Sequence, residues 1–162
     1  MPKLKLSEWA NVSEIVASIV IIASLAYIGM ELNQNTQALQ TDSYQTMTGI
    51  LIELDVAQAL SEDLNRIIML AEASPSDISA EEWERFTHIA FARFGLWEYL
   101  LLSYQDDSIS EAQWAAFEPY LRGYACKRGY KRFWEEKQFA FSIPFKEYFG
   151  SEVLPTCGES QL

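Results

Sequence analysis

Glycine and proline are scarce in this sequence, and their scarcity narrows the fold class. Seven Gly and five Pro among 162 residues are too few for a β protein rich in turns. Basic residues are also few, with 12 Lys and Arg against 23 Asp and Glu, which gives a net charge of −11. Because affinity for nucleic acids comes mainly from neutralising phosphates, this balance argues against a nucleic-acid partner.

Residues that carry metal or nucleophilic chemistry are equally sparse. His88 is the only histidine, so a bis-histidine haem and a di-metal site built from two Glu-x-x-His motifs are excluded within one chain. Glu84 shares a helix face with His88, but at the i, i+4 spacing rather than i, i+3. No Gly-x-Ser-x-Gly elbow, Gly-rich phosphate loop or Cys-x-x-Cys-His motif is present. We therefore predict no cofactor, no metal site and no enzymatic activity.

The most conspicuous feature that is present is the apolar stretch Glu14–Thr36, EIVASIVIIASLAYIGMELNQNT. It holds 16 consecutive uncharged residues, from Ile15 to Met30. That length is borderline for a membrane span, so three interpretations compete. We prefer a membrane anchor, over residues 8–30. The rivals are the buried helix of a soluble bundle and a signal peptide, for which Ser24-Leu25-Ala26 would be a tolerable cleavage site.

The residues around this stretch favour the anchor. Trp9 and Tyr27 are separated by 18 positions, or roughly 27 Å along a helix, which is close to the thickness of the hydrocarbon core and suits two interfacial anchors. Lys3 and Lys5 precede the stretch, and the next basic residue is Arg66. This asymmetry predicts a cytoplasmic N-terminus and an extracytoplasmic bundle, on the periplasmic side.

One face of the predicted anchor carries a candidate packing motif. Ala10, Ala17 and Ser24 recur every seven residues, and small residues let membrane helices approach closely. Glu14 lies beside them, and a carboxylate inside a bilayer is costly unless it is paired or near the headgroups. We therefore expect association with a second copy of the chain or with other membrane protein subunits, and contact with membrane lipid.

The remaining sequence predicts a single all-α domain, 1–162, in which a long N-terminal transmembrane helix continues into a small antiparallel bundle over 31–162. Apolar residues recur at helical spacing and no strand alternation is seen. We expect the first helix to run from about Ser7 to Ala59. The second helix is expected from the N-cap Ser61 to Ala73, and the third from the Ser79–Glu82 capping box to about Tyr104. The fourth should begin at Glu111, capped by Ser110, with Pro119 interrupting or ending it. After Gly123 and Gly129, further helices are expected at about Lys131–Phe139 and at Phe145–Phe149.

Two cysteines permit one disulfide bond. Cys126 and Cys157 are 31 residues apart, and a bond between them would add on the order of 3–4 kcal/mol in the chain-entropy model. A disulfide needs an oxidising compartment, which agrees with the predicted extracytoplasmic bundle. The alternative is a pair of free, buried thiols.

Charge is unevenly spread along the chain. From residue 31 to 118 there are 16 acidic and three basic residues, whereas from 119 to 137 there are six basic and two acidic residues. The candidate basic patch consists of Arg122, Lys127, Arg128, Lys131 and Arg132. It either packs beside the acidic helices or binds anionic lipid or an acidic partner.

Three segments carry a resemblance to a known family. They are IVASIVIIASLAYIGMELNQNTQAL at 15–39, Tyr44-Gln45, and GYKRFWEEKQFAFSIPFKEYF at 129–149. In order and spacing the chain is similar to a widespread group of small, uncharacterised bacterial proteins. Those have an apolar N-terminal helix ending in a Gln-x-Asn-Thr-like motif and a Trp-rich C-terminal helix. In this chain the corresponding residues are Asn33-Gln34-Asn35-Thr36, which depart slightly from that motif. The resemblance implies an N-terminally anchored helical protein and no catalytic chemistry.

Two hypotheses for function follow from the sequence. The first is a non-enzymatic, single-pass membrane protein that works through protein contacts, as a homo-oligomer or as an accessory subunit of a larger membrane complex. The second is a soluble helical bundle with a ligand pocket or enzyme activity. It requires polar groups to converge inside the bundle, and the candidates are Glu53, His88, Arg93, Glu98 and Tyr104.

Overall fold

The structure is a computed structural model that describes residues 6–158, apart from the side chains of 6–8, 10 and 12. Over that range the chain is helical and contains no strand, which confirms the all-α prediction. The α-helices are α1 (Leu6–Leu60), α2 (Glu62–Ala73), α3 (Ala80–Gln105), α4 (Glu111–Ala125), α5 (Arg128–Lys137) and α6 (Ile143–Tyr148). The 3₁₀ turn Gln138–Ala140 follows α5, and the π turn Phe149–Val153 and the 3₁₀ turn Leu154–Gly158 follow α6.

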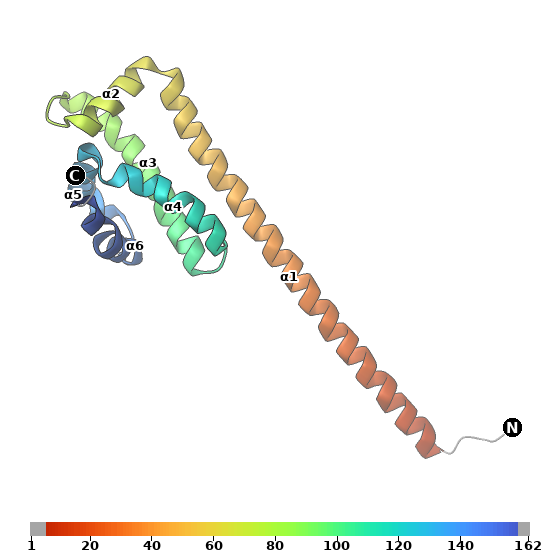
Figure 1. Ribbon diagram of the computed structural model, residues 1–162. Helices are drawn as coiled ribbons and strands as arrows, with labels where there is room; N and C mark the ends of the chain where they lie inside the picture. The colour runs from red at the N-terminus through yellow and green to blue at the C-terminus, as the bar shows by residue number, and fades with distance from the viewer. Residues whose placement is uncertain (1–5, 159–162) are drawn as a thin grey trace. The chain divides into compact units, whose positions relative to one another are not determined.

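Helix α1 is one continuous element of 55 residues, close to the predicted Ser7–Ala59 (Figure 1). No proline interrupts it, and Gly29 and Gly49 both lie in open space without breaking it. The chain divides into two compact units within this helix: the first ends at Leu39 and the second begins at Gln40. The sequence placed its division between anchor and bundle at 30/31, and that membrane boundary stays a prediction.

Serine caps fix the starts of α2, α3 and α4 as predicted. The hydroxyl of Ser61 accepts from the backbone N–H of Leu64 at 3.2 Å, which satisfies one of the unpaired donors of the first turn. The capping box at α3 is complete: Ser79 N donates to Glu82 Oε2 at 2.8 Å and Glu82 N donates to Ser79 Oγ at 3.3 Å. Ser110 forms a second complete box, with Gln113.

The C-terminal helices differ from the prediction in three places, of which the smallest is α6, which begins at Ile143 rather than at Phe145. Pro119 does not end α4, because Leu121 and Ala125 beyond it are buried and tertiary packing offsets the lost hydrogen bond. Helix α5 begins at Arg128, before the glycine that was expected to precede it. A Cβ on Gly129 would lie 2.5 Å from the Ala71 carbonyl oxygen, so glycine here permits α5 to approach the α2 backbone.

The second unit is built around α3, which packs against α2, α4, α5 and α6, with α4 returning antiparallel to it (Figure 1). Aromatic residues fill its core. Phe94 on α3 is 1% exposed, and its ring lies 5.2–5.6 Å from those of Phe133, Trp134 and Phe149. These rings bring α3, α5 and the C-terminal turns together, and the buried aromatic side chains of α3 form part of the core.

Within the second unit, α1 contributes few apolar side chains to the core. Met47 and Leu51 are its buried ones, and Tyr44 lies against Phe117 of α4 with ring centroids 5.5 Å apart. Gln40 donates to the carbonyl of Asp107, at 3.0 Å. Residues 40–60 of α1 therefore attach to the bundle largely through polar and aromatic contacts.

Candidate functional sites

The apolar part of α1 has no protein covering it among the described residues. Every side chain from 13 to 39 is exposed, and Trp9 and Tyr27 are 60% and 65% exposed. The helix from Ser13 to Leu60 is long and apolar enough to cross a membrane. Glu14 lies at the start of this exposed apolar face.

The hydroxyl groups along this part of α1 are satisfied inside the helix. Ser18 donates to the carbonyl oxygen of Glu14 at 2.8 Å, Ser24 to that of Val20 at 2.8 Å, and Thr36 to that of Leu32 at 2.9 Å. A serine or threonine bonded to the carbonyl four residues earlier leaves no polar group in need of water. The hydroxyl groups of Ser18, Ser24 and Thr36 are thus compatible with an apolar environment.

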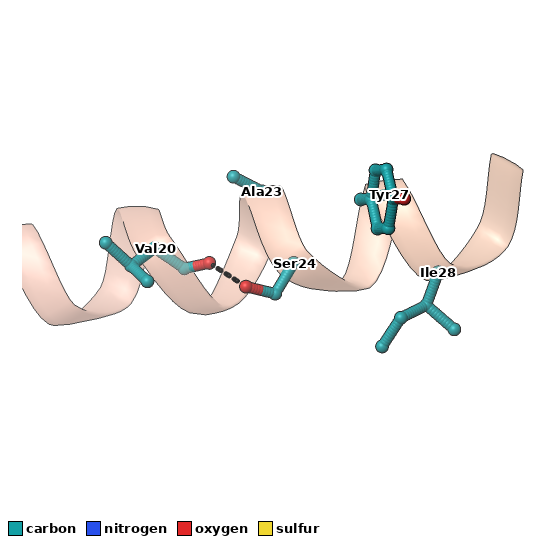
Figure 2. A pocket seen from close by; sticks show the side chains of 5 residues that line it. All are labelled: Val20, Ala23, Ser24, Tyr27 and Ile28. Atoms are coloured by element: carbon teal, nitrogen blue, oxygen red, sulfur yellow. Dashed lines mark hydrogen bonds between the residues drawn. The ribbon is translucent and has the colours of Figure 1, made fainter. Parts of the chain in front are cut away.

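The small residues of α1 form a shallow hollow of about 490 Å³ on the surface of the helix. Figure 2 shows its lining: Ala23 and Ser24 lie between the larger side chains of Val20, Tyr27 and Ile28, and the Ser24 hydroxyl is turned back to the Val20 carbonyl. Ser24 belongs to the predicted small-residue face, and so does Ala17, which is exposed. The third member, Ala10, has its side chain outside the described part of the chain.

Cys126 and Cys157 lie at disulfide distance, with sulfur atoms 2.08 Å apart and Cα atoms 4.9 Å apart. The Cα separation is within the range that a disulfide requires. The pair joins the C-terminal end of α4 to the turn Leu154–Gly158, so it fastens the end of the chain to the bundle.

The candidate basic patch is largely engaged within the fold. Lys127 pairs with Glu72 at 2.6 Å, Arg122 pairs with Glu118, and Arg128 donates to the carbonyl oxygen of Ala73 at 3.4 Å. The contacts of Lys127 and Arg128 join the start of α5 to α2, whereas the Arg122–Glu118 pair lies within α4.

Arg132 is engaged in the same way. It pairs with Glu136 at 2.8 Å and lies over the Trp83 ring, with its guanidinium carbon 3.9 Å from the ring centroid. Lys131, the remaining member of the patch, is partly buried. Contacts inside the fold thus account for most of this charge, and binding of lipid by the patch stays a prediction.

The five polar residues proposed for an internal ligand pocket do not converge. His88 is exposed and lies 4.0 Å from Glu84, and Glu53 is exposed on α1. Glu98 accepts from the backbone N–H of Ser142 at 2.6 Å, and Tyr104 stacks on Trp114 at 5.4 Å. Only Arg93 among them lies in a polar cluster.

That cluster surrounds the guanidinium of Arg93, which is 4% exposed on α3. Its Nη2 donates to Gln58 Oε1 at 2.8 Å and lies 3.6 Å from the carboxylate of Asp55. Its Nη1 donates to the hydroxyl of Tyr130, and its guanidinium carbon lies 4.2 Å from the centroid of the Tyr124 ring. A buried charge is costly unless it is paired and hydrogen-bonded, and here both conditions are met.

Two further residues extend the cluster toward the surface. Tyr120 donates to Asp55 Oδ2 at 2.8 Å, and its hydroxyl lies 2.9 Å from that of Tyr124. Gln58 Nε2 donates to Asn65 Oδ1 at 3.1 Å. Asp55, Gln58, Ala59, Asn65 and Tyr124 line a pocket of about 290 Å³ between α1, α2 and α4.

The charge states in this cluster follow from its surroundings. Burial alone would lower the pKa of Arg93, but Tyr130, Tyr124 and Asp55 raise it above its usual value. Burial also raises the pKa of Tyr130, and partial burial with hydrogen bonds to Tyr124 and Asp55 raises that of Tyr120. Arg93 therefore stays charged, and both phenols stay protonated near neutral pH.

Of this cluster only Arg93 was predicted from the sequence, although the spacing of two residue pairs is consistent with it. Asp55 and Gln58 are three residues apart on one helix, and Tyr120 and Tyr124 are four apart on another, so each pair shares a face. Only tertiary packing brings both of these helix faces into contact with Arg93. No group of three or more His, Cys, Asp or Glu side chains with a metal-binding arrangement occurs in the described part of the chain.

Comparison of the chain with models of known protein families, with curated proteins and with solved structures finds no match.

Proposed function

We propose that this chain is a non-enzymatic, single-pass membrane protein that works through protein contacts. The observation that carries the proposal is the apolar stretch of α1, whose side chains from 13 to 39 are all exposed. Monomeric soluble proteins rarely expose a continuous apolar surface of this extent. A bilayer would cover it, and the internally bonded hydroxyls of Ser18 and Ser24 need no water there.

The proposed topology places the N-terminus in the cytoplasm and the bundle outside it, on the periplasmic side. Lys3 and Lys5, which lie outside the described residues, precede the apolar stretch, and no basic residue follows it before Arg66. The disulfide-distance pair Cys126–Cys157 supports the same orientation, because disulfides persist in oxidising compartments.

The proposed contact is between membrane helices, either of two copies of the chain or of this chain and a subunit of a larger complex. The hollow at Ala23 and Ser24 would let a second helix backbone approach, since small residues drive such packing in lipid. Glu14 would then be paired or hydrated at the helix–helix interface rather than exposed to lipid.

Cell fractionation tests the anchor directly. The full-length chain should stay with membranes through alkaline carbonate washing and be released by detergent, because the helix would be held by hydrocarbon rather than by charge. A deletion of residues 8–30 should be soluble. Recovery of the full-length chain in buffer alone overturns the proposal and favours the soluble bundle.

Association is tested by chemical crosslinking in membranes. Replacing Ser24 with Leu, which fills the hollow, should reduce the crosslinked species at least about tenfold. Glu14→Gln should weaken assembly to a smaller degree, because an amide can still hydrogen-bond. Leu25→Ile is the matched control, since Leu25 is exposed but does not line the hollow, and it should leave crosslinking unchanged.

A further inference from the structure

We propose that the pocket between α1, α2 and α4 binds a small, uncharged molecule that carries neighbouring hydroxyl groups, of the size of a monosaccharide. The pocket is open to solvent, has a volume of about 290 Å³ and lies within the second unit. This inference does not rest on membrane anchoring. It assigns a ligand class to a site that the sequence did not indicate.

The polar groups of the lining are held in place from behind by Arg93. Gln58 uses both ends of its side-chain amide, accepting from Arg93 Nη2 at 2.8 Å and donating to Asn65 Oδ1 at 3.1 Å. Asp55 is held by the Tyr120 hydroxyl at 2.8 Å and by the charge of Arg93, 3.6 Å away. A lining whose polar groups are ordered before binding loses less entropy when a ligand arrives.

The unused hydrogen-bonding capacity of the lining suits a hydroxyl group. A carboxylate has about four acceptor positions, and the side chain of Asp55 is 49% exposed, so it retains acceptors for a ligand. Asn65 Oδ1 accepts from Gln58, and within the described part of the chain Asn65 Nδ2 has no acceptor, so it can donate to a ligand. A hydroxyl can donate to the first group and accept from the second, and adjacent hydroxyls can do so together.

Charge around the pocket favours a neutral ligand. The negative Asp55 is opposed by Arg93, and the positive Lys127 beside Tyr124 is paired with Glu72 at 2.6 Å. In both of these described pairs a positive charge is matched by a negative one, which gives little preference for an anion or a cation. The apolar part of the lining is limited to Ala59 and the ring of Tyr124, so an apolar ligand would bury little surface there.

Because the lining comes from three helices, a bound ligand would bridge α1 to the bundle. Residues 40–60 of α1 bury only Met47 and Leu51 among their apolar side chains. A ligand that contacts Asp55 on α1 and Asn65 on α2 adds to this attachment, and binding to the folded state alone raises its stability.

Binding is tested by nuclear magnetic resonance on the full-length chain in a phosphocholine detergent, which has no sugar headgroup to compete. The probes are D-glucose, D-galactose, myo-inositol and glycerol, each titrated to about 100 mM because a site of this size binds weakly. At least one probe should shift the side-chain amide signals of Gln58 and Asn65 in a saturable manner. Inorganic phosphate and methylammonium are the charged probes and should shift neither.

Variants establish where the probe binds. Asn65→Leu keeps the size of the side chain but removes its donors, and should weaken binding at least about tenfold. Asn35→Leu makes the same chemical change on α1, outside the pocket, and should leave binding unchanged. If Asn65→Leu fails to fold, Asp55→Asn provides a second test, and it should also weaken binding of the probe.

Three results overturn the proposal. The first is the absence of saturable shifts with all four neutral probes, which would mean that the pocket holds water only. The second is binding that survives both Asn65→Leu and Asp55→Asn. The third is tighter binding of phosphate or methylammonium than of any neutral probe, which would contradict the uncharged class.

Discussion

Residues 13–39 of α1 and the bundle of the second unit use apolar side chains in opposite ways. In α1 the side chains of Ile19, Ile22 and Leu25 are 60%, 66% and 64% exposed. In the bundle, Phe94 and Phe145 are at most 1% exposed and lie within a cluster of other aromatic rings. The bundle thus supplies its own core, whereas the apolar residues of α1 depend on an environment that the described chain does not provide.

The two regions treat polar groups differently as well. Along residues 13–39 the hydroxyls of Ser18 and Ser24 bond back to carbonyls of the same helix. In the bundle, Thr87 also bonds back within its own helix, but many polar groups join separate helices, as where Arg66 of α2 bonds Glu82 of α3 at 2.7 Å. Internal bonding suits a helix surrounded by hydrocarbon, and bonds between helices suit a fold in water.

The strongest test of this contrast is truncation of one large side chain in each region. Phe94→Ala should lower the free energy of unfolding of the bundle by about 3–5 kcal/mol, because it opens a cavity among packed rings. Ile21→Ala, at a side chain that is 59% exposed, should leave that free energy unchanged. Urea unfolding of the full chain in mild detergent, followed by tryptophan fluorescence, measures both. A comparable loss for Ile21→Ala would mean that protein, not lipid, covers α1.

The second test removes the covalent link that only the bundle has. Replacing both Cys126 and Cys157 with Ser should lower the free energy of unfolding by about 3–4 kcal/mol, since the closed loop of 31 residues no longer restricts the unfolded chain. Reduction of the wild-type chain should produce the same loss in the same urea experiment. A wild-type chain that is unaffected by reductant would contradict the pairing.

The third test concerns how closely the helices of the bundle approach. Gly129→Ala should destabilise the bundle by about 1–3 kcal/mol, because the added Cβ meets the Ala71 carbonyl and neither backbone can easily move. Gly123→Ala is the matched control, since nothing lies within 4 Å and alanine favours the helix by about 1 kcal/mol. The midpoint temperature of thermal unfolding should therefore fall in Gly129→Ala and rise in Gly123→Ala. Equal shifts of the midpoint in the two variants would argue against the close packing of α2 and α5.

The smallest expected effect is a pH dependence of stability that comes from Glu82, at the start of α3. The backbone hydrogen bond from Ser79 and the ion pair with Arg66 lower the pKa of Glu82 from 4.5 to about 2. A lowered pKa in the folded state stabilises the fold above pH 4.5, and this contribution is lost as the pH falls toward 2. Glu82→Gln keeps the capping box but not the charge. As the pH is lowered from 4.5 to 2, the free energy of unfolding should therefore fall less steeply in the variant than in the wild-type chain. Equal slopes for the two chains would contradict the lowered pKa of Glu82.

Local sequence signals were sufficient where structure depends on near neighbours. The N-caps at Ser61, Ser79 and Ser110 were each predicted, because a cap is formed by residues two or three positions apart. The length of α1 was predicted because its apolar spacing continues past Met30 without a proline. Pro119 was judged by the same local rule and the expectation that it could end α4 was wrong, since burial of Leu121 and Ala125 offsets its local cost.

By itself, then, the sequence determined the all-α class, the position of the long apolar helix and the one possible cysteine pairing. These follow from composition, from periodicity and from the presence of only two cysteines. Tertiary structure alone decided that Asp55, Gln58 and Tyr124 would meet Arg93, and that Gly129 would lie inside a helix rather than before one. Such contacts join positions 31 or more residues apart, and only the packing of helices brings them together.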